Sequence, residues 1–267
     1  MELTKNISHS ISHRIFLVLQ KNNLTCLIVD KHKNPLFIEE FEWLDEASLT
    51  NYLSNRNYLN EIYSSSRLIL VEPKFTLIPS SYLLSQDEYK TIFSLNHSLK
   101  SDEELVTLEI DYDKQILCSV YKELYLPLSK SFPGLRTFHE LYYILKDHRI
   151  SEIQGQVIVI GWLRGSLFIA AIHNNQLILA NNFDVKHDEE LKYYTMLVCE
   201  QLDFKNEQCS LVVLQSDIAA SHIDWFSDYF KKVISPDLSE INIEKLTNAE
   251  LNLFNKSYIL QAALLCE

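Results

Sequence analysis

Glycine is scarce in this 267-residue chain, which has only four: Gly134, Gly155, Gly161 and Gly165. Average usage near 7% would give about 19 glycines in a chain of this length. Glycine has no Cβ and tolerates positive φ angles, so it lets a backbone close around a phosphate. The scarcity therefore argues against a glycine-rich nucleotide-binding loop.

Positive charge is also in short supply. The chain has 24 lysines and arginines against 36 aspartates and glutamates, a net charge of −12, and no run of four basic residues. Nucleic acids and anionic membranes attract basic patches, so this balance disfavours both as partners. No apolar stretch reaches the roughly 18 residues that a spanning helix needs, and we predict no membrane span.

The cysteines have no pattern of disulfides or of a metal site. They are five in number and widely spaced, without a C-x-x-C pair: Cys26, Cys118, Cys199, Cys209 and Cys266. Each lies in an apolar context, where a cysteine usually acts as a small core residue. We therefore predict a cytoplasmic protein with no metal and no cofactor.

Three apolar runs and a helical pattern organise the second half of the chain. The runs are Val157–Ile160, Leu167–Ile172 and Gln176–Ala180, the helix extends from Asp188 to about Leu202, and a fourth run follows at Leu211–Leu214. Apolar runs separated by short turns predict a three-stranded meander. A strand reached by a helical crossover must lie parallel to a neighbour, so we expect a mixed sheet with the fourth strand parallel to the first.

The first half repeats this order at an offset of about 142 residues. Its strand patterns are Ile15–Leu19, Leu24–Val29, Pro35–Glu40 and Leu68–Val71, with a helix capped by Asp45 before the last. A hairpin (Leu105–Ile110 and Gln115–Tyr121) and helices follow, one of them with Phe138, Leu141, Tyr142 and Leu145 on one face. The interpretation is an α/β chain of two similar subdomains. Residues 1–152 hold the inserted hairpin and helices, and residues 153–267 end in a helix over Leu246–Cys266.

One face of the helix from Asp188 to Leu202 is expected to pack on its sheet. Leu191, Tyr194, Val198 and Leu202 recur at steps of three and four residues, which places them on that face. The adjacent pair Tyr193-Tyr194 is assigned to the core rather than to a stacking platform.

Two stretches carry a resemblance to a known family: Lys74-Phe75-Thr76-Leu77-Ile78-Pro79, and Phe183…Asp188-Glu189…Leu191…Tyr193-Tyr194…Gln201-Leu202. Together they are similar to an uncharacterised family of bacterial proteins with an actin-like ATPase fold. The repeated unit resembles the ribonuclease-H-like halves of actin, the sugar kinases and heat-shock-70 proteins. The resemblance implies two ribonuclease-H-like subdomains, each a mixed sheet flanked by helices.

In that superfamily an acid, glycines and a threonine hold the phosphates and Mg²⁺ at the first strand–turn–strand of each half. The resemblance places the metal-side acids at Leu19, Gly161 and Phe168, none of which can ligate a cation. The second half keeps a glycine–hydroxyl pair, Gly165-Ser166. The positions that match a nucleotide or anion site, if one exists, are Asn22, Asn23, Arg164, Gly165, Ser166, Ser216 and Asp217.

No catalytic residue is predicted. Two histidine–aspartate pairs could suggest acid–base catalysis: His187 with Asp188, and His222 with Asp224. His187, however, lies at the start of a helix, where polar residues usually cap the helix and face solvent. The leading hypothesis is a non-catalytic actin-fold module that binds an unknown protein partner, with weak or absent nucleotide binding. The alternatives are a nucleotide-binding or kinase-like enzyme that uses Arg164, Ser166 and Asp217 as ligands, and a self-assembling scaffold.

Overall fold

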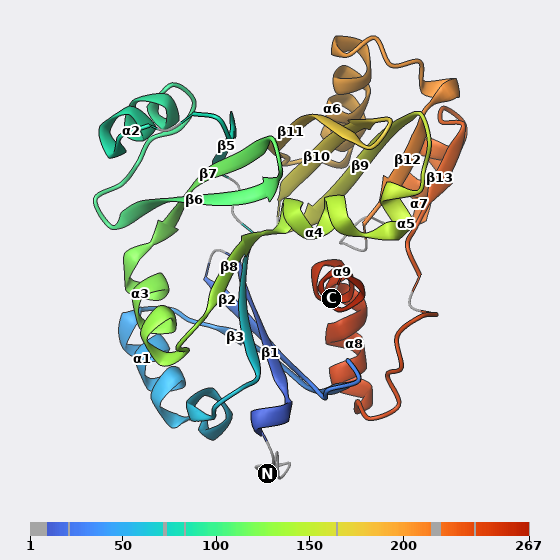
Figure 1. Ribbon diagram of the computed structural model, residues 1–267. Coiled ribbons are helices and arrows are strands. Elements are labelled where there is room, and N and C mark those ends of the chain that lie inside the picture. The colour runs from blue at the N-terminus through green and yellow to red at the C-terminus, as the bar shows by residue number, and fades with distance from the viewer. Residues whose placement is uncertain are drawn as a thin grey trace. The chain divides into compact units, whose positions relative to one another are not determined.

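The computed structural model describes residues 10–20, 22–71, 74–82, 84–163, 165–214, 220–237 and 239–266 (Figure 1). The chain divides into two compact units. Unit 1 contains Met1–Glu140 and Asn242–Leu253, and unit 2 contains Leu141–Ile241 and Phe254–Glu267. Helices α4 (Glu140–Lys146) and α8 (Asn248–Lys256) each begin in unit 1 and continue in unit 2.

A five-stranded mixed sheet of order β3-β2-β1-β4-β8 forms the centre of unit 1. Its strands are β1 (Arg14–Gln20), β2 (Asn23–Val29), β3 (Pro35–Glu42), β4 (Ser65–Leu70) and β8 (Arg136–His139). The first three strands form the predicted antiparallel meander, and β4 runs parallel to β1. Short 3-10 turns η1 (Ser10–Ser12) and η2 (Asn57–Asn60) precede β1 and β4.

Helix α1 (Glu46–Asn55) makes the crossover from β3 to β4. Asp45 caps it as predicted: its Oδ1 accepts a hydrogen bond from the backbone N–H of Ser48 at 2.8 Å. The Ser48 side chain returns to the backbone of Asp45, which completes a capping box.

Unit 1 also contains a small sheet of order β5-β7-β6. It is made of β5 (Phe75–Pro79), β6 (Glu103–Asp111) and β7 (Lys114–Tyr121), and the last two are the predicted hairpin. Helix α2 (Gln86–Ser94) covers one face of this sheet, where Phe93 packs with Ile78 and Leu117. Helix α3 (Lys122–Ser131) follows β7.

The predicted helix through Phe138 is wrong at its start. Arg136–His139 form β8, which pairs in parallel with β4, and α4 begins at the very next residue, Glu140. Phe138, Leu141, Tyr142 and Leu145 fit a helical period because a strand passes into a helix without a turn between them. Backbone hydrogen bonds from β4 favour the extended form over those four residues.

Unit 2 is built on a second five-stranded sheet, of order β11-β10-β9-β12-β13. Its strands are β9 (Gln156–Leu163), β10 (Ser166–His173), β11 (Gln176–Asp184), β12 (Ser210–Val213) and β13 (Lys232–Ile234). The meander is antiparallel and β12 runs parallel to β9, as predicted. Asn174 and Asn175, with φ angles of 50° and 63°, supply the left-handed turn between β10 and β11.

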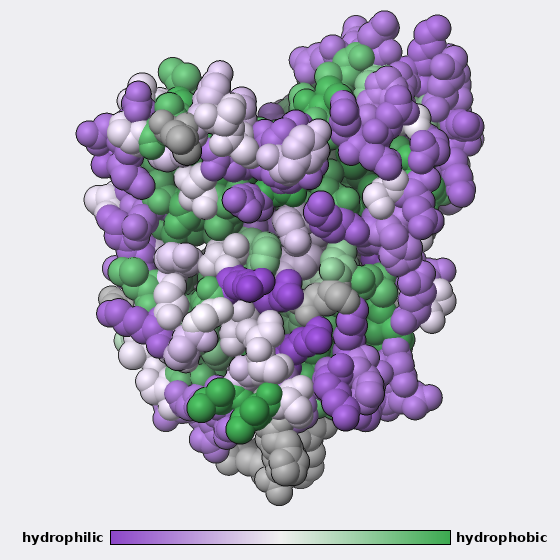
Figure 2. All heavy atoms as spheres, in the orientation of Figure 1, coloured by the Kyte–Doolittle hydropathy of each residue, from purple (hydrophilic) through white to green (hydrophobic). Residues whose placement is uncertain are grey.

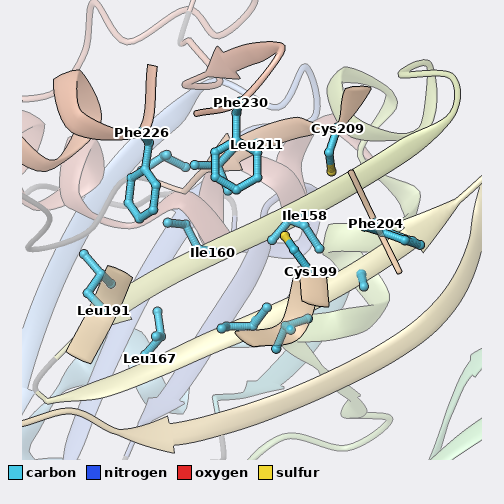
Figure 3. Close-up of a cluster of buried hydrophobic side chains, with 14 of the residues drawn as sticks. Ile158, Ile160, Leu167, Leu191, Cys199, Phe204, Cys209, Leu211, Phe226 and Phe230 are labelled. Carbon is cyan, nitrogen blue, oxygen red and sulfur yellow. The ribbon is translucent and has the colours of Figure 1, made fainter. Parts of the chain in front are cut away.

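Helix α6 (Asp188–Gln201) packs on this sheet through the predicted face (Figure 3). Leu191 and Val198 are 0% and 1% exposed, and Tyr194 and Leu202 are partly buried beside them. The core around them combines strand, helix and loop residues, among them Ile158, Ile160, Leu167, Leu211, Phe226 and Phe230. Tyr193, however, is 59% exposed, so its assignment to the core is wrong.

An aromatic stack joins the third strand to the following helix in each unit. Phe41 and Tyr52 stack with ring centroids 3.9 Å apart, and Phe183 and Tyr194 stack with centroids 4.6 Å apart. The residues of the second pair lie 142 positions after those of the first. The two sheets therefore share the order of their strands, the direction of their strands and the aromatic contact between the third strand and the helix that follows it.

The remaining helices of unit 2 are α5 (His148–Ser151), η3 (Asn206–Gln208), α7 (Ala220–Ser227) and α9 (Tyr258–Leu265). The single C-terminal helix that we predicted is two helices, because the chain breaks at Ser257 between α8 and α9. Helix α9 is buried on all sides from Tyr258 to Leu264, as expected for a helix of high mean hydropathy. In the part of the chain that the structure describes, no helix combines the length and apolar character needed to cross a membrane.

Candidate functional site

The β1–β2 turn of unit 1 contains the candidate residues Asn22 and Asn23. The side-chain amide of Asn22 donates to Glu42 Oε1 at 3.0 Å and to the Trp43 carbonyl at 3.4 Å. The backbone carbonyl of Asn22 accepts from the backbone N–H of Trp43 at 3.0 Å. Asn23 is only 4% exposed, and its Oδ1 accepts from the Thr25 hydroxyl at 3.5 Å. The side-chain amide of Asn22, a donor that a phosphate would need, is thus engaged within the turn, and Asn23 is buried.

The corresponding turn of unit 2 keeps Gly165 and Ser166 side by side at the start of β10. Gly165 has a φ of +78°, and its carbonyl accepts from the Val185 N–H at 2.9 Å. In unit 1 the corresponding hydrogen bond runs from the Trp43 N–H to the backbone carbonyl of Asn22. Glycine suits the position because a left-handed φ strains other residues. Arg164, Ser216 and Asp217 lie outside the described residues.

The three positions assigned to metal-side acids are occupied by packing residues. Leu19 in β1 is 7% exposed and Phe168 in β10 is 5% exposed. Gly161 in β9 faces Leu214, whose Cδ1 would lie 3.4 Å from a Cβ added at that glycine. None of these side chains offers an oxygen to a hard cation. Among the described residues, no group of three or more His, Cys, Asp or Glu side chains is placed to hold a metal ion.

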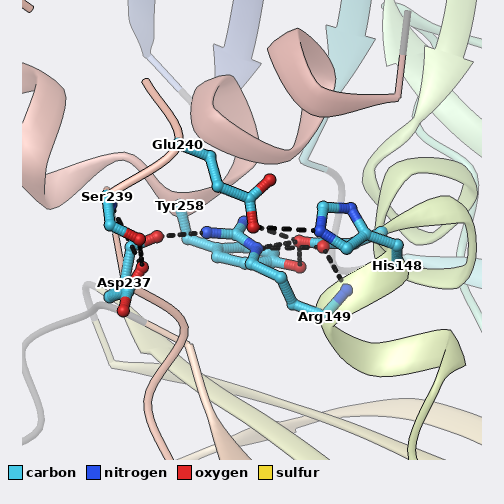
Figure 4. Close-up of polar contacts among 7 residues, drawn as sticks. His148, Arg149, Asp237, Ser239, Glu240 and Tyr258 are labelled. Carbon is cyan, nitrogen blue, oxygen red and sulfur yellow. Dashed lines mark hydrogen bonds and ion pairs between the residues drawn. The ribbon is translucent and has the colours of Figure 1, made fainter. Parts of the chain in front are cut away.

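A buried ionic cluster lies in unit 2 (Figure 4). The Asp147 carboxylate is fully buried. It accepts hydrogen bonds from Nε of Arg149 at 3.0 Å and from Nη2 of Arg149 at 2.6 Å. The Tyr258 hydroxyl, from α9, donates to the same carboxylate at 2.6 Å. Nη1 of Arg149 donates to the backbone carbonyl of Asp237 at 2.5 Å. The cluster therefore ties α5 to α9 and to the loop after β13.

The protonation states of this cluster do not favour catalysis. Burial raises the pKa of the Asp147 carboxyl, but hydrogen bonds from Arg149 and Tyr258 outweigh it and hold that pKa below its usual range. Burial and then the charge of Asp147 raise the pKa of Tyr258 well above its ordinary value. Asp147 thus stays ionised, Tyr258 stays protonated, and both are bound to each other. The arrangement is a structural clamp.

A second closed network lies in unit 1, around the carboxylate of Glu39 in β3. It accepts from Arg56 at 3.0 Å, from the Tyr52 hydroxyl at 3.2 Å and from the Tyr58 hydroxyl. The two tyrosine hydroxyls lie 2.6 Å apart. Burial, and then the charge of Glu39, raises the pKa of the neighbouring thiol of Cys26, which disfavours the reactive thiolate. This network anchors η2 and the end of α1 to β3.

His187 stands at the start of α6, as predicted, and is exposed to solvent. Its backbone N–H donates to Glu190 Oε2 at 3.3 Å, so the residue takes part in capping. Sequence reasoning missed the Asp147 cluster because Tyr258 is 111 residues away. The only local signal was an aspartate at a helix start with an arginine two residues later.

Comparison with known proteins agrees with the fold and assigns no activity. The profile of a family described as "Protein of unknown function (DUF3822)" matches residues 3–233. A Bacteroides thetaiotaomicron protein of actin-like ATPase fold and unknown function is 19% identical over 98% of this chain and 99% of that one, with a TM-score of 0.79. A chain of the PilM–PilN type IV pilus biogenesis complex is 9% identical over 95% and 97%, with a TM-score of 0.55. No curated protein sequence matches the chain. The expected actin-like ATPase fold is confirmed.

Proposed function

Because the chain belongs to the family of unknown function DUF3822, we propose that it is a non-catalytic actin-fold protein that binds another protein. The observation that carries this proposal is the loss of the metal-side acids, whose positions hold Leu19, Gly161 and Phe168. Phosphoryl transfer in this superfamily depends on a cation that oxygen ligands hold against the phosphates. A leucine and a phenylalanine packed in the core supply none.

A precedent from the same fold supports the binding role. The PilM–PilN chain that shares the fold comes from an assembly of two different proteins. An actin-like fold can therefore contribute to an assembly through its surface. By this reading the partner of the present chain is a protein and not a nucleic acid, since the chain carries a net charge of −12.

The equal strand orders of the two sheets support an origin by duplication, with halves at residues 1–152 and 153–267. The five cysteines are free thiols, four of them buried, which supports a reducing cytoplasm. Nucleotide binding is weak or absent, because the Asn22 amide donates to Glu42 of β3 and Asn23 is buried.

Calorimetric titration with ATP, with and without Mg²⁺, tests the proposal against a nucleotide-binding enzyme. The feature that favours the enzyme is the retained pair Gly165-Ser166. We expect no binding, or weak binding that Mg²⁺ does not strengthen, since a few anion contacts are largely offset by the cost of ordering the ligand. Tight, Mg²⁺-dependent binding that Ser166→Ala weakens, while Ser54→Ala in α1 leaves it unchanged, would replace this proposal with the enzyme.

A further inference from the structure

A leucine in the loop between β3 and α1 stands outside the core of unit 1. Leu44 is 92% exposed and immediately precedes Asp45, the cap residue of α1. A hydrophobic residue at that position commonly packs against the fourth residue of the helix. That residue is Leu49, which is 2% exposed, so Leu44 does not make this contact. Figure 2 shows hydrophobic residues singly among hydrophilic ones around α1 and α3, so exposure alone does not mark a site.

Hydrogen bonds hold the backbone of this loop at two successive residues. The N–H of Leu44 donates to Ser48 Oγ at 3.2 Å, and the N–H of Trp43 donates to the carbonyl of Asn22 at 3.0 Å. The exposed leucine is therefore carried by a loop whose backbone is fixed to α1 on one side and to the β1–β2 turn on the other. A partner that binds Leu44 has little of this loop left to order.

Unit 2 has the same loop with a lysine in place of the leucine. Lys186 stands 142 residues after Leu44 and is exposed. Its N–H donates to Glu190 Oε2 at 2.6 Å, four residues further on, just as Leu44 donates to Ser48. The geometry of the loop therefore accepts a charged residue at this position. Leucine is not needed to form the loop of unit 1, and a role in binding accounts for its presence there.

The segment around Leu44 is acidic. Residues 35–55 contain no lysine, arginine or histidine and five acids: Glu39, Glu40, Glu42, Asp45 and Glu46. Glu42 and Asp45 are exposed and lie within two residues of Leu44 along the chain. Two residues of chain span at most about 7 Å, which is below the screening length of about 8 Å at physiological salt. A ligand in contact with Leu44 therefore experiences the charge of both carboxylates.

The basic residues beside this segment do not neutralise it. Arg56 follows α1 and forms an ion pair with Glu39 at 3.0 Å. The β1–β2 turn contributes one lysine, Lys21, next to Asn22 in the chain. Five acids against these two cations leave three negative charges. A negative surface attracts a cationic partner and repels an acidic one.

We propose that Glu42, Leu44 and Asp45, called the Leu44 surface, form a docking surface for a basic segment of another protein that also carries apolar side chains. This inference rests on the proposed binding function and specifies the chemistry of the partner. The leucine contributes affinity because binding removes its apolar surface from water. The carboxylates select a cationic partner and speed its encounter with the loop.

Charge argues against a second copy of this chain as the occupant. A two-fold dimer through the Leu44 surface would place Glu42 and Asp45 of one copy against the same residues of the other. Like charges that face each other across an interface are destabilising. The net charge of −12 adds to that repulsion.

The test begins with random-sequence peptides displayed on phage. The pool is depleted on the Leu44→Ser variant and then selected on the wild-type protein. We expect enrichment of peptides that combine lysine or arginine with apolar residues. An enriched peptide with a fluorescent label then gives dissociation constants by anisotropy. Leu44→Ser, which leaves the net charge unchanged, should weaken its binding about tenfold or more, as loss of an interface anchor does.

A second variant tests the charge of the surface. Glu42→Gln/Asp45→Asn retains an acceptor for the Asn22 amide and a cap for α1. It should weaken binding of the selected peptide and make the affinity less dependent on salt. The matched control Asp87→Asn/Glu104→Gln removes the same charge from exposed positions elsewhere on unit 1 and should change the affinity little.

The matched control for the leucine is Leu95→Ser, which alters another leucine of unit 1, 77% exposed. It should leave the affinity unchanged, and thermal melting of each variant confirms that it is folded. Absent enrichment, enrichment of acidic or uncharged peptides, or equal effects of Leu44→Ser and Leu95→Ser would overturn the docking surface. So would self-association seen by light scattering that Leu44→Ser abolishes. These results leave the proposed function standing, whereas Mg²⁺-dependent ATP turnover would overturn the function itself.

Discussion

Replacement of Leu191 by alanine is expected to destabilise unit 2 by about 2–5 kcal/mol, the usual loss for truncating a buried leucine. Leu191 is 0% exposed, and it packs in the same core as Ile160, Leu167 and Phe226 (Figure 3). Sheet residues line the cavity that the substitution leaves, and a sheet held by hydrogen bonds on both sides cannot collapse into it. We therefore expect a value in the upper half of that range.

Thermal unfolding followed by circular dichroism measures this effect. A loss of 1 kcal/mol lowers the Tm by about 2–4 °C in chains of 150–250 residues, so a loss in that upper half should lower it by roughly 7–20 °C. The control is Glu200→Ala on the same helix, which is exposed and should change stability by less than about 0.5 kcal/mol. Lys192 is unsuitable as a control, because its side chain contacts the Trp225 ring. Equal losses for Leu191→Ala and Glu200→Ala would refute the packing of α6.

Three other outcomes follow from the buried polar groups. Asp147→Ala leaves the Arg149 guanidinium buried without its partner and should cost about 3–5 kcal/mol in urea unfolding, more than Asp147→Asn, which keeps an acceptor; equal losses would contradict the clamp. Burial raises the pKa of Asp30, but hydrogen bonds from Asn34 and other donors outweigh it and lower that pKa to about 2. Its stabilising effect is thus complete above the unfolded value of 3.8 and disappears as the pH falls towards 2, so wild type should lose its stability advantage over Asp30→Asn across that window. Burial raises the pKa of the Cys209 thiol to about 12, so a thiol-specific disulfide reagent should modify it only after urea is added; rapid reaction in the native protein would contradict its burial.

Much of the fold could be predicted from the sequence because its patterns are local. The apolar runs on either side of Asn174-Asn175 specify a hairpin, and the spacing of Leu191 and Val198 specifies the face of α6. Strand β8 was missed because Phe138 continues the helical period of α4, and only pairing with β4 reveals the strand. Strand β13, with three residues, is too short to show any period.

The candidate site was less predictable, because its contacts join residues that are distant in the sequence. Tyr258 of α9 donates a hydrogen bond to Asp147, 111 residues earlier in the chain, and no local sequence pattern predicts that contact. The pair Tyr193-Tyr194 divides between surface and core, since neighbours on a helix point about 100° apart. Tyr194 stacks on Phe183 of β11, whereas Tyr193 is 59% exposed on the outer side of α6.

We propose above that this chain does not hydrolyse ATP. A phosphate-release assay on the purified protein, with and without Mg²⁺ and beside Arg164→Ala, measures hydrolysis itself. We expect release at the level of the buffer in every sample, because Leu19, Gly161 and Phe168 cannot hold the cation that phosphoryl transfer needs. Mg²⁺-dependent release well above that level, abolished by Arg164→Ala, would instead identify the protein as an enzyme.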